Sequence, residues 1–143
     1  MGKNGVTGII VPLDGEVINR VFHHRPIIAM FVDKFPSDLA VGDTAFLYET
    51  GGGRVLEGEG SIAELTHETV DEVRKYGTEL SVSSEELDRY LAASGKKNND
   101  KMLVLKLRDA IKYVRALKCS LPVGKDGAYM TKVVFSTILA ENS

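Results

Sequence analysis

Residues 44–65 read TAFLYE, TGGGR and VLEGEGSIAEL, two strand-like segments joined by a glycine-rich turn. Aromatic and other apolar residues dominate 44–49 and recur through 55–65, whereas residues 50–54 have the composition of a hairpin tip. Gly58 and Gly60 lie inside the returning segment, where glycines favour a bulge or the sharp curvature that closes a barrel. This stretch therefore predicts a hairpin within a curved sheet.

The residues before this hairpin predict a strand, a helix and a second strand. Residues 7–13 are strand-like, and Asp14 is suited to cap a helix with an apolar face of Val17, Ile18, Val21 and Phe22. Because Pro26 disfavours helical geometry at the residue before it, the helix must end within residues 23–25. Residues 27–32 form an apolar run that is long enough for a buried strand and too short for a helix.

The residues after the hairpin predict two helices. The first covers residues 66–76 and ends at Gly77, a residue type common just past a helix end. The second begins where Ser83 and Glu86 have the spacing of a capping box, and it reaches about residue 93. A polar loop follows over residues 94–101.

The last third of the chain predicts two strands and one ambiguous element. Residues 102–108 and 112–119 alternate as strands do, and we expect them to pair through a short turn near Asp109. In segment 131–140, the run 133–135 (VVF) favours a strand, whereas Thr131 is suited to cap a helix. Strands joined mainly by hairpins, with helices inserted between them, predict the α+β class with an antiparallel sheet.

Composition is that of an ordinary globular protein, with 43% hydrophobic and 27% charged residues. The length of 143 residues fits one domain spanning residues 1–143. The single cysteine, Cys119, excludes an intrachain disulfide, which suits a reducing compartment. The early apolar run at residues 9–11 is too short for a signal or a membrane span, so we expect a cytoplasmic protein.

Charge is unevenly distributed along the chain, although the net charge is only −2. Residues 57–88 contain ten acidic and two basic residues, whereas residues 96–125 contain nine basic and two acidic ones. The basic final third is either an ordinary solvated surface or a surface that binds phosphates.

Several segments resemble the PUA-like superfold, which includes the ASCH and EVE domains. They are the early strand–helix pair, LAVGD (39–43), FLYE (46–49) and VLEGEGSI (55–62). A closer resemblance, to a small archaeal family of uncharacterised ASCH-type proteins, rests on EGEG (57–60), KYG (75–77), SSEEL (83–87), LVLKLRD (103–109), LPVG (121–124) and GAYMT (127–131). The resemblance implies an antiparallel pseudo-β-barrel with short peripheral helices, and a cleft that accepts a modified nucleotide or short RNA.

Some ASCH proteins are amidohydrolases that act on acylated cytidine, and they resemble one another in a Gly-Lys-Lys-Thr pattern after the first helix. This chain has VFHHRP at residues 21–26, without the lysine or the threonine. A hydrolase acting on a modified nucleoside is therefore the alternative function, and a non-catalytic role is the more strongly indicated one. A third possibility is a protein-interaction domain that uses the acidic helices within residues 66–93.

Candidate ligand contacts come from cations and tyrosines near the expected strand ends. The sequence predicts phosphate contacts from Arg25, Lys34, Lys106, Arg108 and Lys112, and base contacts from Tyr48 or Tyr129. Each of these residues has an ordinary alternative, as a solvated cation or a buried tyrosine. Adjacent His23 and His24 do not match the spacing of metal ligands, so we expect no metal and no cofactor.

Overall fold

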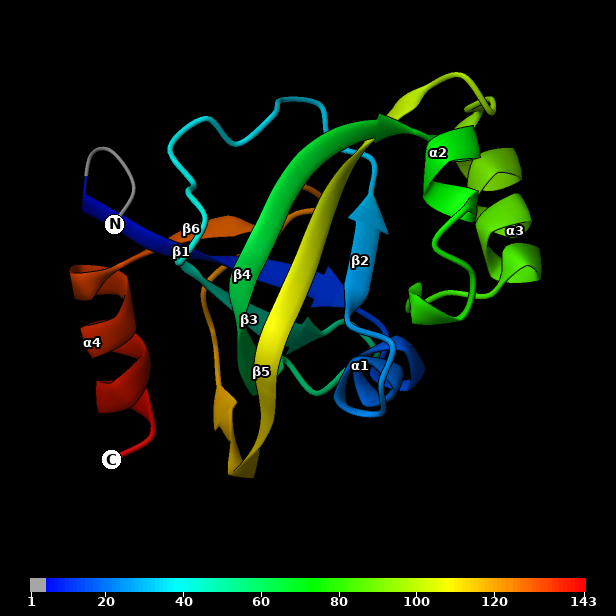
Figure 1. Ribbon diagram of the computed structural model, residues 1–143. Helices are drawn as coiled ribbons and strands as arrows, with labels where there is room; N and C mark the ends of the chain where they lie inside the picture. Colours follow the sequence, from blue (N-terminus) through cyan, green and yellow to red (C-terminus); the bar gives the residue numbers. More distant parts are fainter. Residues whose placement is uncertain (1–4) are drawn as a thin grey trace.

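The computed structural model describes residues 5–143 and shows a strongly curved sheet with helices around it (Figure 1). In chain order the elements are β1 (Val6–Leu13), α1 (Gly15–Phe22), β2 (Ile27–Met30), β3 (Thr44–Glu49), β4 (Val55–Thr69), α2 (Val70–Arg74), a 3-10 turn (Gly77–Glu79), α3 (Ser84–Ser94), β5 (Lys101–Lys118), β6 (Ala128–Thr131) and α4 (Lys132–Glu141). The predicted α+β class is confirmed.

The six strands form one sheet in the order β2-β5-β4-β3-β1-β6. Neighbouring strands pair antiparallel except β1 and β3, which run parallel because α1 and β2 lie between them in the chain. The long β4 and β5 curve together across the front of Figure 1. The predicted hairpin at residues 44–65 is β3 and β4, with its tip at residues 50–54.

The strands predicted over residues 102–108 and 112–119 form a single strand, so the turn predicted near Asp109 is wrong. β5 runs unbroken from Lys101 to Lys118 and pairs with β4 along its length. Asp109 adopts φ 53°, but no glycine or proline follows it to reverse the chain. Instead Arg108 faces Ser61 and Ile111 faces Glu59, so one extra residue of β5 is accommodated as a bulge.

A second, wider bulge lies near the start of β4 and toward the end of β5. Leu56 faces Leu117 and Gly58 faces Lys112, so Glu57 alone stands opposite residues 113–116. The bulges at Gly58 and Gly60 confirm the curvature that these glycines predict. At Gly58, an added Cβ would lie 2.2 Å from the carbonyl oxygen of Ile111, so only glycine allows this close approach of the strands.

Helix boundaries follow the predicted caps, except at α2. Asp14 caps α1 through its Oδ1, and Ser83 and Glu86 form a complete capping box on α3. α2 is only Val70–Arg74, so the helix predicted over 66–76 is too long at both ends. It begins late because residues 66–69 pair with β5. Segment 131–140 is the helix α4, capped by Thr131.

Buried side chains form three clusters because both faces of the sheet are covered. Ile9 and Val11 of β1 point into the barrel interior, whereas Ile10 points to the cluster under α4. On β2, Ile28 points into the interior and Ile27 packs against α2 and α3. Figure 1 shows α4 and the α2–α3 pair on opposite sides of the barrel. Among the helices described, none has the length and apolar character to span a membrane.

Candidate functional site

The seven predicted contact residues do not meet around one hollow. Lys34 and Tyr129 line the same cavity, Arg25 lines a second and Tyr48 lines a third. The remaining three, Lys106, Arg108 and Lys112, lie along β5. The site must therefore be rebuilt from the surroundings of each cavity.

The Lys34 cavity, about 220 Å³, lies between residues 34–38 and 126–129, with Ile9 also lining it. The two segments are linked by the Asp33 backbone N–H, which donates to Asp126 Oδ2 at 2.9 Å, and by the Asp38 N–H, which donates to the Tyr129 hydroxyl at 3.3 Å. Asp38 and Asp126 line the cavity together with Lys34, so its charged residues give no excess of positive charge. This balance does not favour a polyanion.

On β5, the three predicted cations differ in their surroundings. Lys106 forms an ion pair with Glu64 across the strands at 3.4 Å, so its charge is already matched. Arg108 and Lys112 are exposed, and within residues 5–143 neither has an ion-pair partner. From Arg108 to the end of β5 the strand carries four cations and one acid: Arg108, Lys112, Arg115, Lys118 and Asp109.

The Tyr48 cavity, about 360 Å³, combines an aromatic side chain with a cation. It is lined by Tyr48, Arg54 and residues 120–124. Tyr48 is 8% exposed and belongs to the cluster under α4, so it offers a fixed aromatic edge rather than a mobile side chain. Among the described residues that line this cavity, Arg54 is charged and none is acidic.

A neighbouring hollow of about 240 Å³ shares Arg54 and Ser120 with the Tyr48 cavity and adds Lys118 and Glu141. Arg54 and Lys118 are close because the Cys119 N–H donates to the Arg54 carbonyl at 2.9 Å. The carboxylate of Glu141 accepts both the N–H and the hydroxyl of Ser120, and the hydroxyl's hydrogen bond is the main cause that lowers the pKa of Glu141. We call Tyr48, Arg54, Lys118 and residues 120–124 the Tyr48 face.

The backbone of the Tyr48 face is held in place from α4. Asn142 accepts a hydrogen bond from the Lys118 N–H at 2.8 Å and donates to the Lys118 carbonyl at 2.9 Å. Cys119 is buried beneath it, and burial raises the pKa of its thiol, which leaves it a packing residue. The cations of this face therefore project from a rigid frame.

Arg54 is a functional candidate that the sequence-based selection missed, and Lys118, a member of the basic final third, is not among the seven predicted contacts. Arg54 ends the glycine turn and adopts φ 50°, a left-handed conformation that is unfavourable for an arginine. The run GGGR offers one signal, since a cation directly after glycines is presented at the tip of a hairpin. The closeness of residues 118–124 to that tip is not readable from local sequence.

An acidic residue of β4, Glu59, lies beside β5 and is engaged by it. Glu59 accepts a hydrogen bond from the Tyr113 hydroxyl at 2.7 Å. Burial, together with this bond, raises the pKa of Tyr113 well above its usual range, so the phenol stays protonated. Glu59 and Tyr113 thus form a structural pair beside the Tyr48 face.

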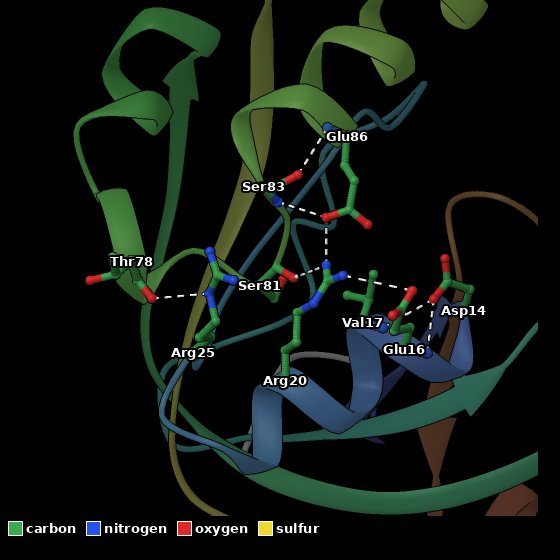
Figure 2. Close-up of polar contacts among 9 residues, drawn as sticks. All are labelled: Asp14, Glu16, Val17, Arg20, Arg25, Thr78, Ser81, Ser83 and Glu86. Carbon is green, nitrogen blue, oxygen red and sulfur yellow. Dashed lines mark hydrogen bonds and ion pairs between the residues drawn. The ribbon is translucent and has the colours of Figure 1, made fainter.

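Arg25 lies beside a polar network that joins α1 to α3 (Figure 2). Arg20 donates to Glu86 at 2.5 Å and to the Ser81 carbonyl at 3.3 Å. Burial alone would raise the pKa of Glu86, but hydrogen bonds from Ser83 and Arg20 outweigh it and lower that pKa. Arg25 itself donates from Nε to the Thr78 carbonyl at 3.1 Å.

The two adjacent histidines at the end of α1 are residues of a metal-ligating type. Within residues 5–143, no group of three or more His, Cys, Asp or Glu side chains is arranged to hold a metal ion. His23 Nδ1 lies 2.6 Å from the Asn19 carbonyl oxygen, and His24 is exposed with φ 70°. Both histidines belong to the end of α1.

Comparison with solved structures confirms the predicted fold resemblance. A serine-to-alanine variant of ASCH from Zymomonas mobilis aligns with a TM-score of 0.76 and 14% identity, over 95% of this chain and 96% of that chain. A tyrosine-to-phenylalanine variant of the same protein aligns with a TM-score of 0.75 and 12% identity, over 94% of this chain and 97% of that chain. The N-terminal domain of McrB from Staphylothermus marinus aligns with a TM-score of 0.62 and 12% identity, over 94% of each chain. At identities this low, the structural alignments establish a shared fold, which is of the PUA-like, ASCH type.

Sequence comparison adds a family match. Residues 6–132 match a family described as a domain of unknown function, DUF365. No match to the sequence is found among curated proteins.

Proposed function

The chain belongs to the DUF365 family, and on the chemistry of its Tyr48 face we propose that it binds single-stranded RNA. Arg54 and Lys118 contact phosphates, and a base lies against Tyr48 in the adjoining cavity. Arg108 and Lys112 extend the phosphate contacts along β5. Arg25, Lys34, Lys106 and Tyr129 lie outside this face.

The observation that carries the proposal is the cavity lined by an arginine, an aromatic edge and, among its described residues, no carboxylate. Single strands are bound without strong sequence preference by cations that follow the backbone and aromatic rings that meet the bases. The exposed cations of β5 supply the first requirement and Tyr48 the second. The ASCH-type fold is consistent with this role.

The Tyr48 cavity also supplies hydrogen-bond donors. Tyr48 and Arg54 can donate to a base edge or a phosphate, whereas the Ser120 hydroxyl already donates to Glu141.

Replacing Arg54 by glycine should change stability and affinity in opposite directions. Glycine adopts φ 50° without the strain of a Cβ, so the free energy of unfolding should rise by about 1 kcal/mol. Losing the phosphate contact should weaken RNA binding about tenfold at low salt. The slope of log affinity against log salt should become shallower by about 0.7. Urea unfolding and fluorescence-anisotropy titration of a short RNA measure these quantities.

His24→Gly is the matched control, because His24 is exposed, has φ 70° and lies outside the Tyr48 face. It should gain similar stability and keep wild-type RNA affinity. Unchanged affinity in Arg54→Gly, or an equal loss in both variants, would remove the basis for the proposed RNA contact.

A further inference from the structure

A separate cavity of about 260 Å³ lies where the α1–β2 connection meets the segment that carries α2 and α3. Arg25 comes from the α1–β2 connection. The other lining residues come from the segment that carries α2 and α3: Arg74, Gly77, Thr78, Leu80, Val82, Ser83, Ser84 and Leu87. We call it the Arg25 cavity. It shares no residue with the Tyr48 face or the Lys34 cavity.

The charges around the Arg25 cavity leave one guanidinium uncompensated. Arg20 is paired with Glu86, and Arg74 is paired with Asp88 at 2.6 Å. Arg25 has a backbone carbonyl as its partner and, within residues 5–143, no carboxylate. Figure 2 shows its terminal nitrogens without a drawn contact, on the side away from Thr78. Among the described residues lining the cavity, none is acidic, so an anion entering it meets net positive charge.

The hydrogen-bond donors in the Arg25 cavity suit a phosphate group. Both Nη groups of Arg25 are available, because only its Nε is used. The Ser84 hydroxyl accepts a hydrogen bond from Arg74 and retains its own proton to donate, whereas the Ser83 hydroxyl is already engaged with Glu86. A phosphate monoester accepts hydrogen bonds on three oxygens and carries a charge of about −1.5 to −2, so it suits the free Nη groups of Arg25 and a neighbouring hydroxyl better than a singly charged carboxylate does.

The rest of the lining indicates what the phosphate is attached to. Leu80, Val82 and Leu87 line the same cavity, and Leu80 and Leu87 belong to the cluster that packs α2 and α3 against the sheet. An apolar wall beside a fixed cation suits a ligand with a compact apolar body and an anionic end.

We propose that the Arg25 cavity binds a small phosphate monoester, with its phosphate on Arg25 and its organic portion against Leu80, Val82 and Leu87. This site is separate from the RNA-binding face and does not depend on the RNA proposal. Arg25 is predicted from sequence as a phosphate contact, and in this proposal the phosphate belongs to a small molecule and not to RNA.

Phenyl phosphate is a direct probe, because it combines a phosphate monoester with a compact apolar ring. Titrated into ¹⁵N-labelled protein, it should shift the amide signals of Thr78, Ser83 and Ser84 in a saturable way. Arg25→Ala should weaken the binding at least about tenfold, since a hydrogen-bonded charge pair is lost. Arg25→Lys should restore only part of it, because lysine lacks the planar fork of donors. Arg89→Ala removes an exposed arginine of α3 that lines none of the cavities described and should leave binding unchanged.

Three outcomes of the phenyl phosphate titrations would overturn the proposal. The first is the absence of saturable shifts in the wild type, and the second is equal binding by wild type and Arg25→Ala. The third is displacement of phenyl phosphate by RNA, which would assign the cavity to the RNA strand. Benzoate, which carries the same ring on a carboxylate, should bind more weakly; equal affinity would contradict the phosphate assignment. A failure of RNA binding in the wild type would leave each of these results unaffected.

Discussion

Gly127→Ala should reduce the free energy of unfolding by about 3 kcal/mol, because the change introduces backbone strain and a steric clash together. Gly127 has φ +80°, and a Cβ there would lie 2.3 Å from the carbonyl oxygen of Ile10. That carbonyl belongs to β1, which pairs with β6 directly after Gly127. Relief would require β6 to move away from β1, and urea unfolding followed by circular dichroism measures the loss.

Gly124→Ala is the matched control for this prediction. Gly124 lies in the same loop, has no positive φ, and a Cβ there would meet nothing within 4 Å. Its stability should stay close to wild type or rise slightly through the reduced entropy of the unfolded chain. Equal losses at both glycines would mean that the close approach of residue 127 to β1 is not a constraint on the fold.

Arg54→Glu should weaken RNA binding about a hundredfold at low salt, because it removes a phosphate contact and places a like charge beside the strand. The loss should shrink as salt is added, since exposed charges are screened. Arg54 is exposed, so the substitution should leave the core intact. Anisotropy titrations of the same RNA over a series of salt concentrations measure both effects.

Lys34→Glu is the matched charge reversal, because Lys34 is exposed in the cavity that also contains Asp38 and Asp126. It changes the net charge by the same amount as Arg54→Glu, so a non-specific electrostatic effect would weaken both variants equally. The proposed site predicts a much smaller loss for Lys34→Glu. A larger loss there would move the RNA site to the Lys34 cavity, where sequence analysis places Lys34 and Tyr129 as contacts.

The parts of the fold that follow from sequence are those set by local interactions. The hairpin at residues 44–65, the Asp14 cap and the capping box of Ser83 and Glu86 all depend on residues within a few positions of one another. The glycines at 58 and 60 also predict the bulges, since their missing side chains allow the strands to approach. These elements, together with the family resemblance, lead to the correct fold class.

The errors come from pairing between distant residues. Residues 66–69 are predicted as the start of a helix, but backbone pairing with residues 101–104 of β5 keeps them extended. Asp109 resembles a turn residue, yet β4 continues alongside, so its left-handed conformation makes a bulge instead. A strand partner far along the chain thus outweighs local propensity in both places.

The candidate site was predictable in residue type and not in arrangement. Tyr48 and the basic character of β5 are visible in the sequence, and both contribute to the Tyr48 face. Arg25 and Lys34, both predicted as phosphate contacts, lie beyond opposite ends of β2 and line different cavities. Arg54 becomes a candidate only when the loop of residues 120–124 is seen beside it.

The most direct test of the RNA-binding proposal is an NMR titration of the wild-type protein with a short single-stranded RNA. We expect the signals of Tyr48, Arg54, Lys118 and residues 120–124 to shift together, with the same concentration dependence. Signals of Lys34, residues 35–38 and Tyr129 should stay in place. Shifts confined to the second group, or no shift at low salt, would contradict the assignment of RNA to the Tyr48 face.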